Sequence, residues 1–175
     1  MRGTAMTTRP DRSEAVEYYF TYIDKVPDGD ICQILERQSV DTIGLFQQIS
    51  DEQSHHRYAA DKWSIREVVS HLNDTERMFV FRALWFARGF ETPLPSFDQN
   101  IAIAGASADE RSWPSHVDEF RSVRAATLAL FLNLPQEAWT RRGIASGNPF
   151  TVRALAFITA GHVFHHEAIL RERYL

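Results

Sequence analysis

Apolar residues recur at helical spacing in four long stretches of this chain. The first stretch begins after Asp30, whose carboxylate can cap a helix, and it ends before the polar segment 51–58. Polar residues fill the positions between, so the pattern predicts an amphipathic helix. Its apolar side is formed by Ile31, Ile34, Leu35, Val40, Ile43, Leu45, Phe46 and Ile49.

The second stretch starts with a helix-capping sequence. Ser64 and Glu67 fit an S-x-x-E capping box, in which the hydroxyl accepts a hydrogen bond from a free backbone N–H and the glutamate bonds back to the cap. The helix should run to Gly89, where glycine can end it. Its apolar side is formed by Ile65, Val68, Val69, Leu72, Phe79, Leu84 and Phe86.

The third and fourth stretches also carry start signals. Pro114 suits the first turn of a helix that begins near Ser112 and continues to Asn133, and Thr151 can cap a last helix that reaches the C-terminus. The third helix presents Val117, Phe120, Val123, Leu128 and Phe131, and the fourth presents Leu155, Ile158, Ile169 and Leu170.

The connecting segments show no alternation typical of strands. Residues 90–112 contain two prolines and predict a long crossover with one helical turn around FDQNIAIA, and residues 140–149 predict an irregular loop. Residues 1–13 should be a flexible lead-in, followed by a short extra helix before Pro27. The pattern therefore predicts an all-α protein, a four-helix bundle with a long crossover between its second and third helices, in one domain over residues 14–175.

Composition narrows the classes of function. A length of 175 residues with 44% hydrophobic content suits one buried core, and 19 basic against 23 acidic residues, without a basic run, argue against nucleic acid as a partner. Cys32 is the only cysteine and is interpreted as a core residue. Because we find no secretory leader and no apolar run near the roughly 18 residues that span a bilayer, we expect a cytoplasmic protein without a membrane partner.

The segment GHVFHHEAIL, residues 161–170, carries three of the seven histidines. His162 and His166 lie one helical turn apart on the same side as Leu155 and Ile158, so both should point into the bundle. Buried imidazoles are costly unless an ion or a polar network satisfies their nitrogens. This spacing alone fits a metal site and a solvated helix face equally well. His165 falls on a more polar row.

His71, on the flank of the second helix, is the best candidate for a third ligand. Together the three side chains would form a three-nitrogen site that leaves positions open for water or substrate, as catalytic metal sites require. The H-E-x-x-H signature of zinc proteases is excluded because Val163 follows His162. The E-x-x-H motif of di-iron bundles has no inward-facing match either. Glu167 should point away from the pair and is interpreted as a surface or salt-bridging residue, and His55, His56 and His116 are interpreted as solvated.

The segments KWSIREVVSHLNDTER, RALWFARG and TAGHVFHHEAILRERYL resemble the DinB-like family of metal-binding four-helix bundles. The most specific signs are Trp63, eight residues before His71, and the H-x-x-x-H pair formed by His162 and His166. The resemblance implies an up-down-down-up bundle, often a homodimer, with one divalent ion (zinc, nickel or iron) held by these three histidines. It also implies a relation to transferases and isomerases that use bacillithiol or mycothiol.

Three functions remain open at the level of the sequence. A divalent ion held by three neutral imidazoles keeps its positive charge and can hold a low-molecular-weight thiol as thiolate, which suits a transferase acting on a small electrophilic substrate. The alternatives are a metal-dependent hydrolase and a non-catalytic, metal-stabilised dimeric stress or binding protein. The loops offer Asp98, Asn100, Arg141 and Arg142 as polar contacts to substrate, with Asp98 as the one catalytic candidate, although ordinary loop polarity explains each equally well.

Overall fold

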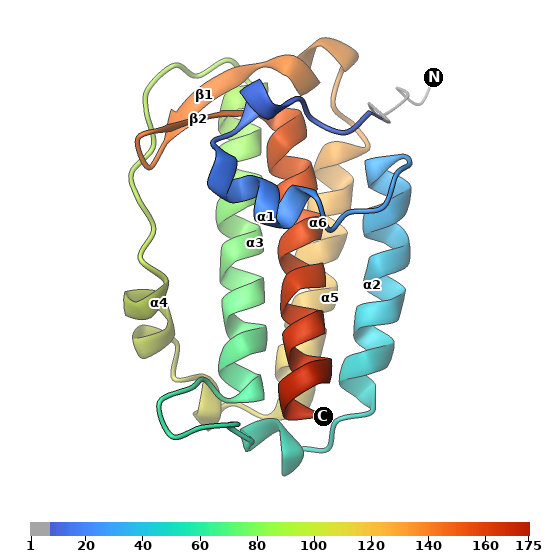
Figure 1. Ribbon diagram of the computed structural model, residues 1–175, viewed down its shortest axis with the longest axis vertical. Helices are drawn as coiled ribbons and strands as arrows, with labels where there is room; N and C mark the ends of the chain where they lie inside the picture. Colours follow the sequence, from blue (N-terminus) through green and yellow to red (C-terminus); the bar gives the residue numbers. More distant parts are fainter. Residues whose placement is uncertain (1–7) are drawn as a thin grey trace.

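Four long helices form the body of the protein in a computed structural model that describes residues 8–175. They are α2 (Ile31–Gln47), α3 (Ile65–Ala87), α5 (Trp113–Phe131) and α6 (Val152–Ile169). Helices α2 and α6 run in one direction, and α3 and α5 run in the other (Figure 1). Each of α2 and α3 packs against both α5 and α6. The predicted four-helix bundle with up-down-down-up order is therefore confirmed.

The helices start where their capping residues predict. The Asp30 carboxylate accepts hydrogen bonds from the backbone N–H groups of Cys32 and Gln33, at 3.0 and 3.1 Å. Ser64 and Glu67 complete the capping box of α3 in both directions. At the other end of the chain, α6 continues into a π-helical turn (Leu170–Tyr174).

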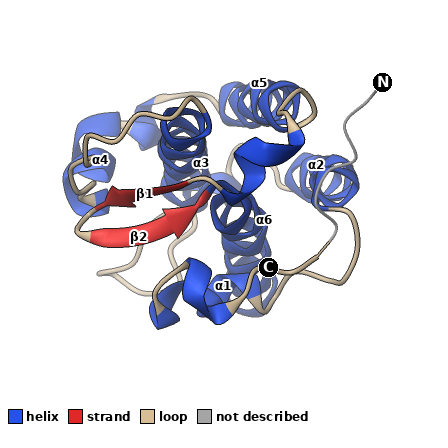
Figure 2. Cartoon of the chain, turned by 90° about the horizontal axis from the view of Figure 1, so that it is seen from above, coloured by secondary structure: helices blue, strands red, loops and turns tan. Residues whose placement is uncertain are grey.

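The N-terminal segment lies along α6. It contains two short 3-10 turns (Arg12–Glu14 and Glu17–Tyr19) and the single-turn helix α1 (Phe20–Ile23), which is the short helix expected before Pro27 (Figure 2). The close approach requires a glycine, because a Cβ on Gly161 would collide with the backbone carbonyl of Tyr22.

The expected flexible lead-in, residues 1–13, differs from the structure in the part that can be described. Residues 1–7 lie outside the described range. Arg9 donates hydrogen bonds to the carbonyl oxygens of Ile23 and Val26, both at 2.6 Å, so the chain is held against the fold from this point.

The long crossover contains α4 (Gln99–Ala106) where the sequence predicts a helical turn, and this helix packs beside α3. Further 3-10 turns stand at Gln53–His55, Ala108–Glu110 and Gln136–Thr140. Within the described residues, no helix is both long and apolar enough to cross a membrane.

The expectation that the chain has no strand is wrong for the segment before α6. Strands β1 (Arg142–Ala145) and β2 (Asn148–Thr151) pair antiparallel as a hairpin. Ser146 and Gly147 form its turn with positive φ angles of 52° and 72°, the geometry that suits the twist of a two-residue hairpin. Four-residue strands are too short for an alternating pattern to be recognised, and burial of Phe150 and Ala145 stabilises them instead.

A polar network ties the four long helices together inside the core. Arg124 of α5 donates from Nε and Nη2 to the two carboxylate oxygens of Glu76 on α3, both at 2.8 Å. Its Nη1 donates to Gln38 Oε1 on α2, and Gln38 Nε2 donates to the Ala160 carbonyl on α6. Arg124 is fully buried and Glu76 is 2% exposed. Removing both charges from water is costly, and the ion pair and its hydrogen bonds offset that cost.

His116, which we expected to be solvated, and Glu167, which we interpreted as a surface or salt-bridging residue, are both buried. His116 is fully enclosed and its Nε2 lies 2.9 Å from the Ala108 carbonyl, because the segment before α5 folds back over its first turn. Glu167 does point away from the histidine pair, but it meets α2, where the Thr42 hydroxyl donates to its carboxylate. Burial raises the pKa of Glu167. Cys32 is buried in the core, as we expected.

Candidate metal centre

Helices α3 and α6 bring three histidines together between them. His71 projects from the second turn of α3, and His162 and His166 project from successive turns of α6. One nitrogen from each ring lies within 4.8 Å of the others, and Nε2 of His71 is 3.1 Å from Nε2 of His162. In a tetrahedral zinc site with Zn–N distances of about 2.0–2.1 Å, ligand atoms lie roughly 3.3 Å apart. The spacing of this pair therefore fits a shared ion.

Burial keeps these imidazoles neutral. Desolvation lowers the pKa of His71 to about 4 and that of His166 to about 3. It also lowers the pKa of His162 well below its usual value, with a further contribution from the neighbouring histidines. At neutral pH all three rings have a free nitrogen lone pair, which is the form that binds a metal ion.

Thr75 fixes the orientation of His162. Its hydroxyl donates to the His71 carbonyl at 2.6 Å, and its oxygen lies 3.3 Å from Nδ1 of His162. That oxygen can accept a hydrogen bond from Nδ1–H of His162, and in this tautomer the lone pair of His162 is on Nε2, which faces the cluster. Such an outer hydrogen bond is typical of histidines that bind metals.

Aromatic rings enclose the cluster. The Trp63 ring lies 4.9 Å from the His71 ring, and the Tyr22 ring lies 5.2 Å from the His162 ring, both measured between centroids. His165 is half-buried beside Tyr22 and His166 and does not belong to the cluster. His55 and His56 are exposed.

A cavity of about 240 Å³ opens onto His71 and His162. The N-terminal segment, the crossover and the hairpin all contribute to its walls. We expected this of the crossover and of the segment that forms the hairpin. None of the described residues that line it is an aspartate or a glutamate. The polar and aromatic residues of the wall include Tyr18, Tyr22, Arg82, Phe97, Gln99 and Ser146.

The loop residues we proposed as substrate contacts have other roles. Asp98 is exposed and caps α4 by accepting from the backbone N–H groups of Asn100 and Ile101. Arg141 donates to the Ala87 carbonyl, and Arg142 donates to the Ser13 carbonyl at 2.9 Å. None of these side chains is among the described residues that line the cavity.

Arg82 and the tyrosines were missed in the sequence. Arg82 stands three residues after Phe79 and four before Phe86, so it falls on the inward row of α3, where an arginine is unusual. This position could have identified Arg82 as a candidate functional residue from the sequence. Tyr18, Tyr19 and Tyr22 gave none, because helical spacing of aromatic residues equally predicts simple packing.

Two other hollows differ in their chemistry. One of about 180 Å³ reaches His166 from the side of Trp63, whose carbonyl accepts a hydrogen bond from the Tyr174 hydroxyl.

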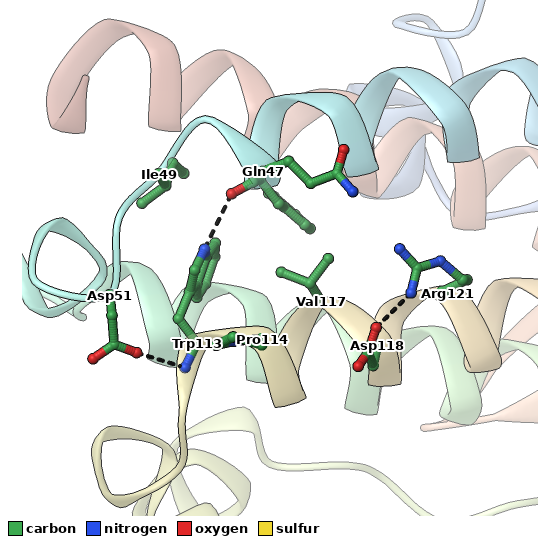
Figure 3. Close-up of a pocket in the computed structure, with 9 residues that line it drawn as sticks. Gln47, Ile49, Asp51, Trp113, Pro114, Val117, Asp118 and Arg121 are labelled. Carbon is green, nitrogen blue, oxygen red and sulfur yellow. Dashed lines mark hydrogen bonds and ion pairs between the residues drawn. The ribbon is translucent and has the colours of Figure 1, made fainter.

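The other hollow, of about 350 Å³, lies between the end of α2 and the start of α5 (Figure 3). There Trp113 bonds to Asp51 and to the Phe46 carbonyl, and Asp118 pairs with Arg121. Among the described residues, no group of three possible metal ligands lies at this hollow.

Comparisons with known proteins identify the family and agree with the fold. A family model described as the DinB superfamily matches residues 34–170. YfiT from Bacillus subtilis, described as a probable metal-dependent hydrolase with an unusual four-helix bundle topology, superposes with a TM-score of 0.72 at 19% identity, over 94% of this chain and 90% of that one. A mycothiol-dependent maleylpyruvate isomerase gives a TM-score of 0.69 at 12% identity, over 83% of this chain and 61% of that one. No curated protein sequence matches the chain.

Proposed function

This chain belongs to the DinB superfamily, and from that premise we propose that it is an enzyme that binds one divalent ion through His71, His162 and His166. We propose further that it transfers a low-molecular-weight thiol to a small electrophilic substrate. The observation that carries the proposal is the cluster of three neutral imidazoles, those of His71 and His162 buried and that of His166 half-buried, beside an open cavity. Imidazole suits zinc, nickel and iron alike. When bound, the ion would supply a positive charge that lowers the pKa of a thiol or water beside it.

The groups around the cavity favour a thiol over water as the nucleophile. No aspartate or glutamate is among the described residues of its wall, so a carboxylate base for water is missing there. A free thiol has a pKa of about 8.5, against about 15.7 for water, and therefore needs less help to ionise. Burial raises the pKa of Tyr22, so its hydroxyl stays protonated and can donate a hydrogen bond to a substrate oxygen.

A metal-dependent hydrolase is the second candidate. The likeness to YfiT over almost the whole of both chains supports it, although at 19% identity the likeness itself extends to the fold. Hydrolysis and thiol transfer would use the same ion and the same cavity. They differ in whether turnover needs an added thiol.

Thiol dependence of turnover tests the proposal. Protein loaded with zinc, nickel or iron is mixed with 1-chloro-2,4-dinitrobenzene and a series of small thiols. The thiolate sulfur bonds to the ring carbon, chloride leaves with the bonding electrons, and the thiol proton goes to solvent. We expect the metal-loaded protein to accelerate thioether formation and His162→Ala to lower that acceleration at least about 100-fold, because the ion is lost.

His55→Ala is the matched control, since this histidine is exposed and outside the cluster. It should keep the full rate. Hydrolysis of activated esters at equal rates with and without thiol would instead favour the hydrolase. Absence of both activities from protein with a full complement of metal would contradict an enzymatic function.

A further inference from the structure

Arg82 is the one of three buried arginines on α3 and α5 that has no carboxylate partner among the described residues. Arg66, Arg82 and Arg124 are 4%, 3% and 0% exposed. Arg66 pairs with Asp51 at 2.7 Å and Arg124 pairs with Glu76 at 2.8 Å. Within residues 8–175, no aspartate or glutamate oxygen lies within ion-pair distance of Arg82.

The hydrogen bonds of Arg82 use only part of its guanidinium. Nη2 donates to Ser146 Oγ at 2.7 Å and, more weakly, to the Pro95 carbonyl at 3.4 Å. A guanidinium has five N–H donors, so capacity remains for a second group that can accept two bonds in parallel. Burial also lowers the pKa of Arg82, while a hydrogen bond and a charge interaction with Tyr19 oppose this effect.

Arg82 lines the same cavity as His71 and His162. It is the only arginine, lysine, aspartate or glutamate among the described residues of that wall. No aspartate or glutamate that would repel an anion is among these residues. The electrostatics of the wall therefore favour a negatively charged ligand.

The spacing sets the shape of that ligand. His71 and Arg82 are eleven residues apart on α3, which places their Cα atoms roughly 16 Å apart along the helix axis. Both side chains nevertheless line one cavity, so the space between them is continuous. A small elongated molecule can span it.

We propose that the ligand of this cavity carries a carboxylate that binds Arg82 in bidentate fashion, while its reactive end lies at the three histidines. The proposal rests on the proposed function and deepens it, because it assigns the substrate class of the same site. The carboxylate can belong to the thiol or to the electrophile, and Arg82 recognises the same chemical group in either case.

Matched synthetic ligands test this inference by calorimetry. We use 6-mercaptohexanoate, the neutral 6-mercaptohexan-1-ol, and hexanoate, which lacks the thiol, on zinc-loaded and on metal-free protein. Wild-type protein should bind 6-mercaptohexanoate at least about tenfold more tightly than the alcohol, as expected of a hydrogen-bonded ion pair. Arg82→Met should abolish this preference and leave the affinity for the alcohol unchanged. Arg82→Lys, which keeps the charge without the fork, should retain part of it.

Hexanoate separates this inference from the proposed function. Its binding to metal-free wild-type protein, and loss of that binding in Arg82→Met, would support the role of Arg82 even if thiol binding proved independent of zinc. Zinc-dependent thiol binding with equal affinities for acid and alcohol would overturn the inference and leave the proposed function intact. Equal affinity of wild type and Arg82→Met for hexanoate would overturn it as well.

A competition experiment shows whether the thiol or the electrophile carries the carboxylate. If saturating 6-mercaptohexan-1-ol leaves hexanoate binding unchanged, the two occupy separate places and the anion belongs to the electrophile. If it displaces hexanoate and 6-mercaptohexanoate needs both zinc and Arg82, the anion belongs to the thiol. Arg82→Met should melt no lower than wild type without ligand, since it removes an uncompensated buried charge, and this checks that the variant is folded.

Discussion

Loading the protein with a divalent ion should raise its free energy of unfolding by about 4 kcal/mol when the free ion is about 1,000-fold above its dissociation constant. The ligand atoms come from two helices that meet only in the folded chain, so the unfolded state cannot form the same site. For a chain of this length the melting temperature should rise by about 10 °C. Thermal melts in zinc and after dialysis against a chelator measure the difference.

His162→Ala provides the decisive variant for this prediction. It removes the imidazole whose Nε2 lies 3.1 Å from Nε2 of His71 and whose Nδ1 faces the Thr75 hydroxyl. The melting temperature should therefore no longer respond to zinc. His165→Ala is the matched control, since His165 is on the same helix but outside the cluster, and it should respond as the wild type does. Equal melting of the wild type with and without zinc would show that the ion does not bind the folded site.

Arg124→Ala should lower the free energy of unfolding by about 3–5 kcal/mol. The substitution leaves the Glu76 carboxylate buried without its bidentate partner and frees Gln38 from one of its two hydrogen bonds. Because the network joins all four long helices, we expect the loss to affect the whole bundle cooperatively. Urea unfolding followed by circular dichroism measures it.

Arg121→Ala is the control on the same helix, three residues earlier. Its ion pair with Asp118 is solvent-exposed, so its loss should change stability little. Glu76→Gln combined with Arg124→Met removes both charges and should recover much of the stability lost in Arg124→Ala. A single Arg124→Ala variant as stable as the wild type would show that the buried pair contributes nothing to the fold.

The positions of the long helices could be predicted because their signals are local. Asp30, Ser64 and Thr151 each accept a backbone hydrogen bond within three residues, so a short segment contains the whole cap. The hairpin before α6 could not, because its four-residue strands depend on burial of Phe150 by distant parts of the chain.

The candidate site was predictable for the histidines and not for the cavity beside them. Periodicity places His162 and His166 on one helix face and His71 on the flank of another helix, and the resemblance to the DinB-like family selected these three, which the structure brings together. The exposure of His116 and Glu167 was misjudged because it depends on which segment covers them. Arg82 could have been found on its apolar row, but its missing carboxylate partner is visible only in three dimensions.

Metal content of the purified protein tests the central claim most directly. Untagged wild type and the variants His71→Ala, His162→Ala, His166→Ala and His165→Ala are reconstituted with zinc, dialysed and measured by mass spectrometry. We expect about one ion per chain in the wild type and in His165→Ala, and loss of the ion in the other three variants. Wild-type protein that retains no stoichiometric ion after reconstitution, or variants that all retain it, would contradict the assignment of His71, His162 and His166 as a metal site.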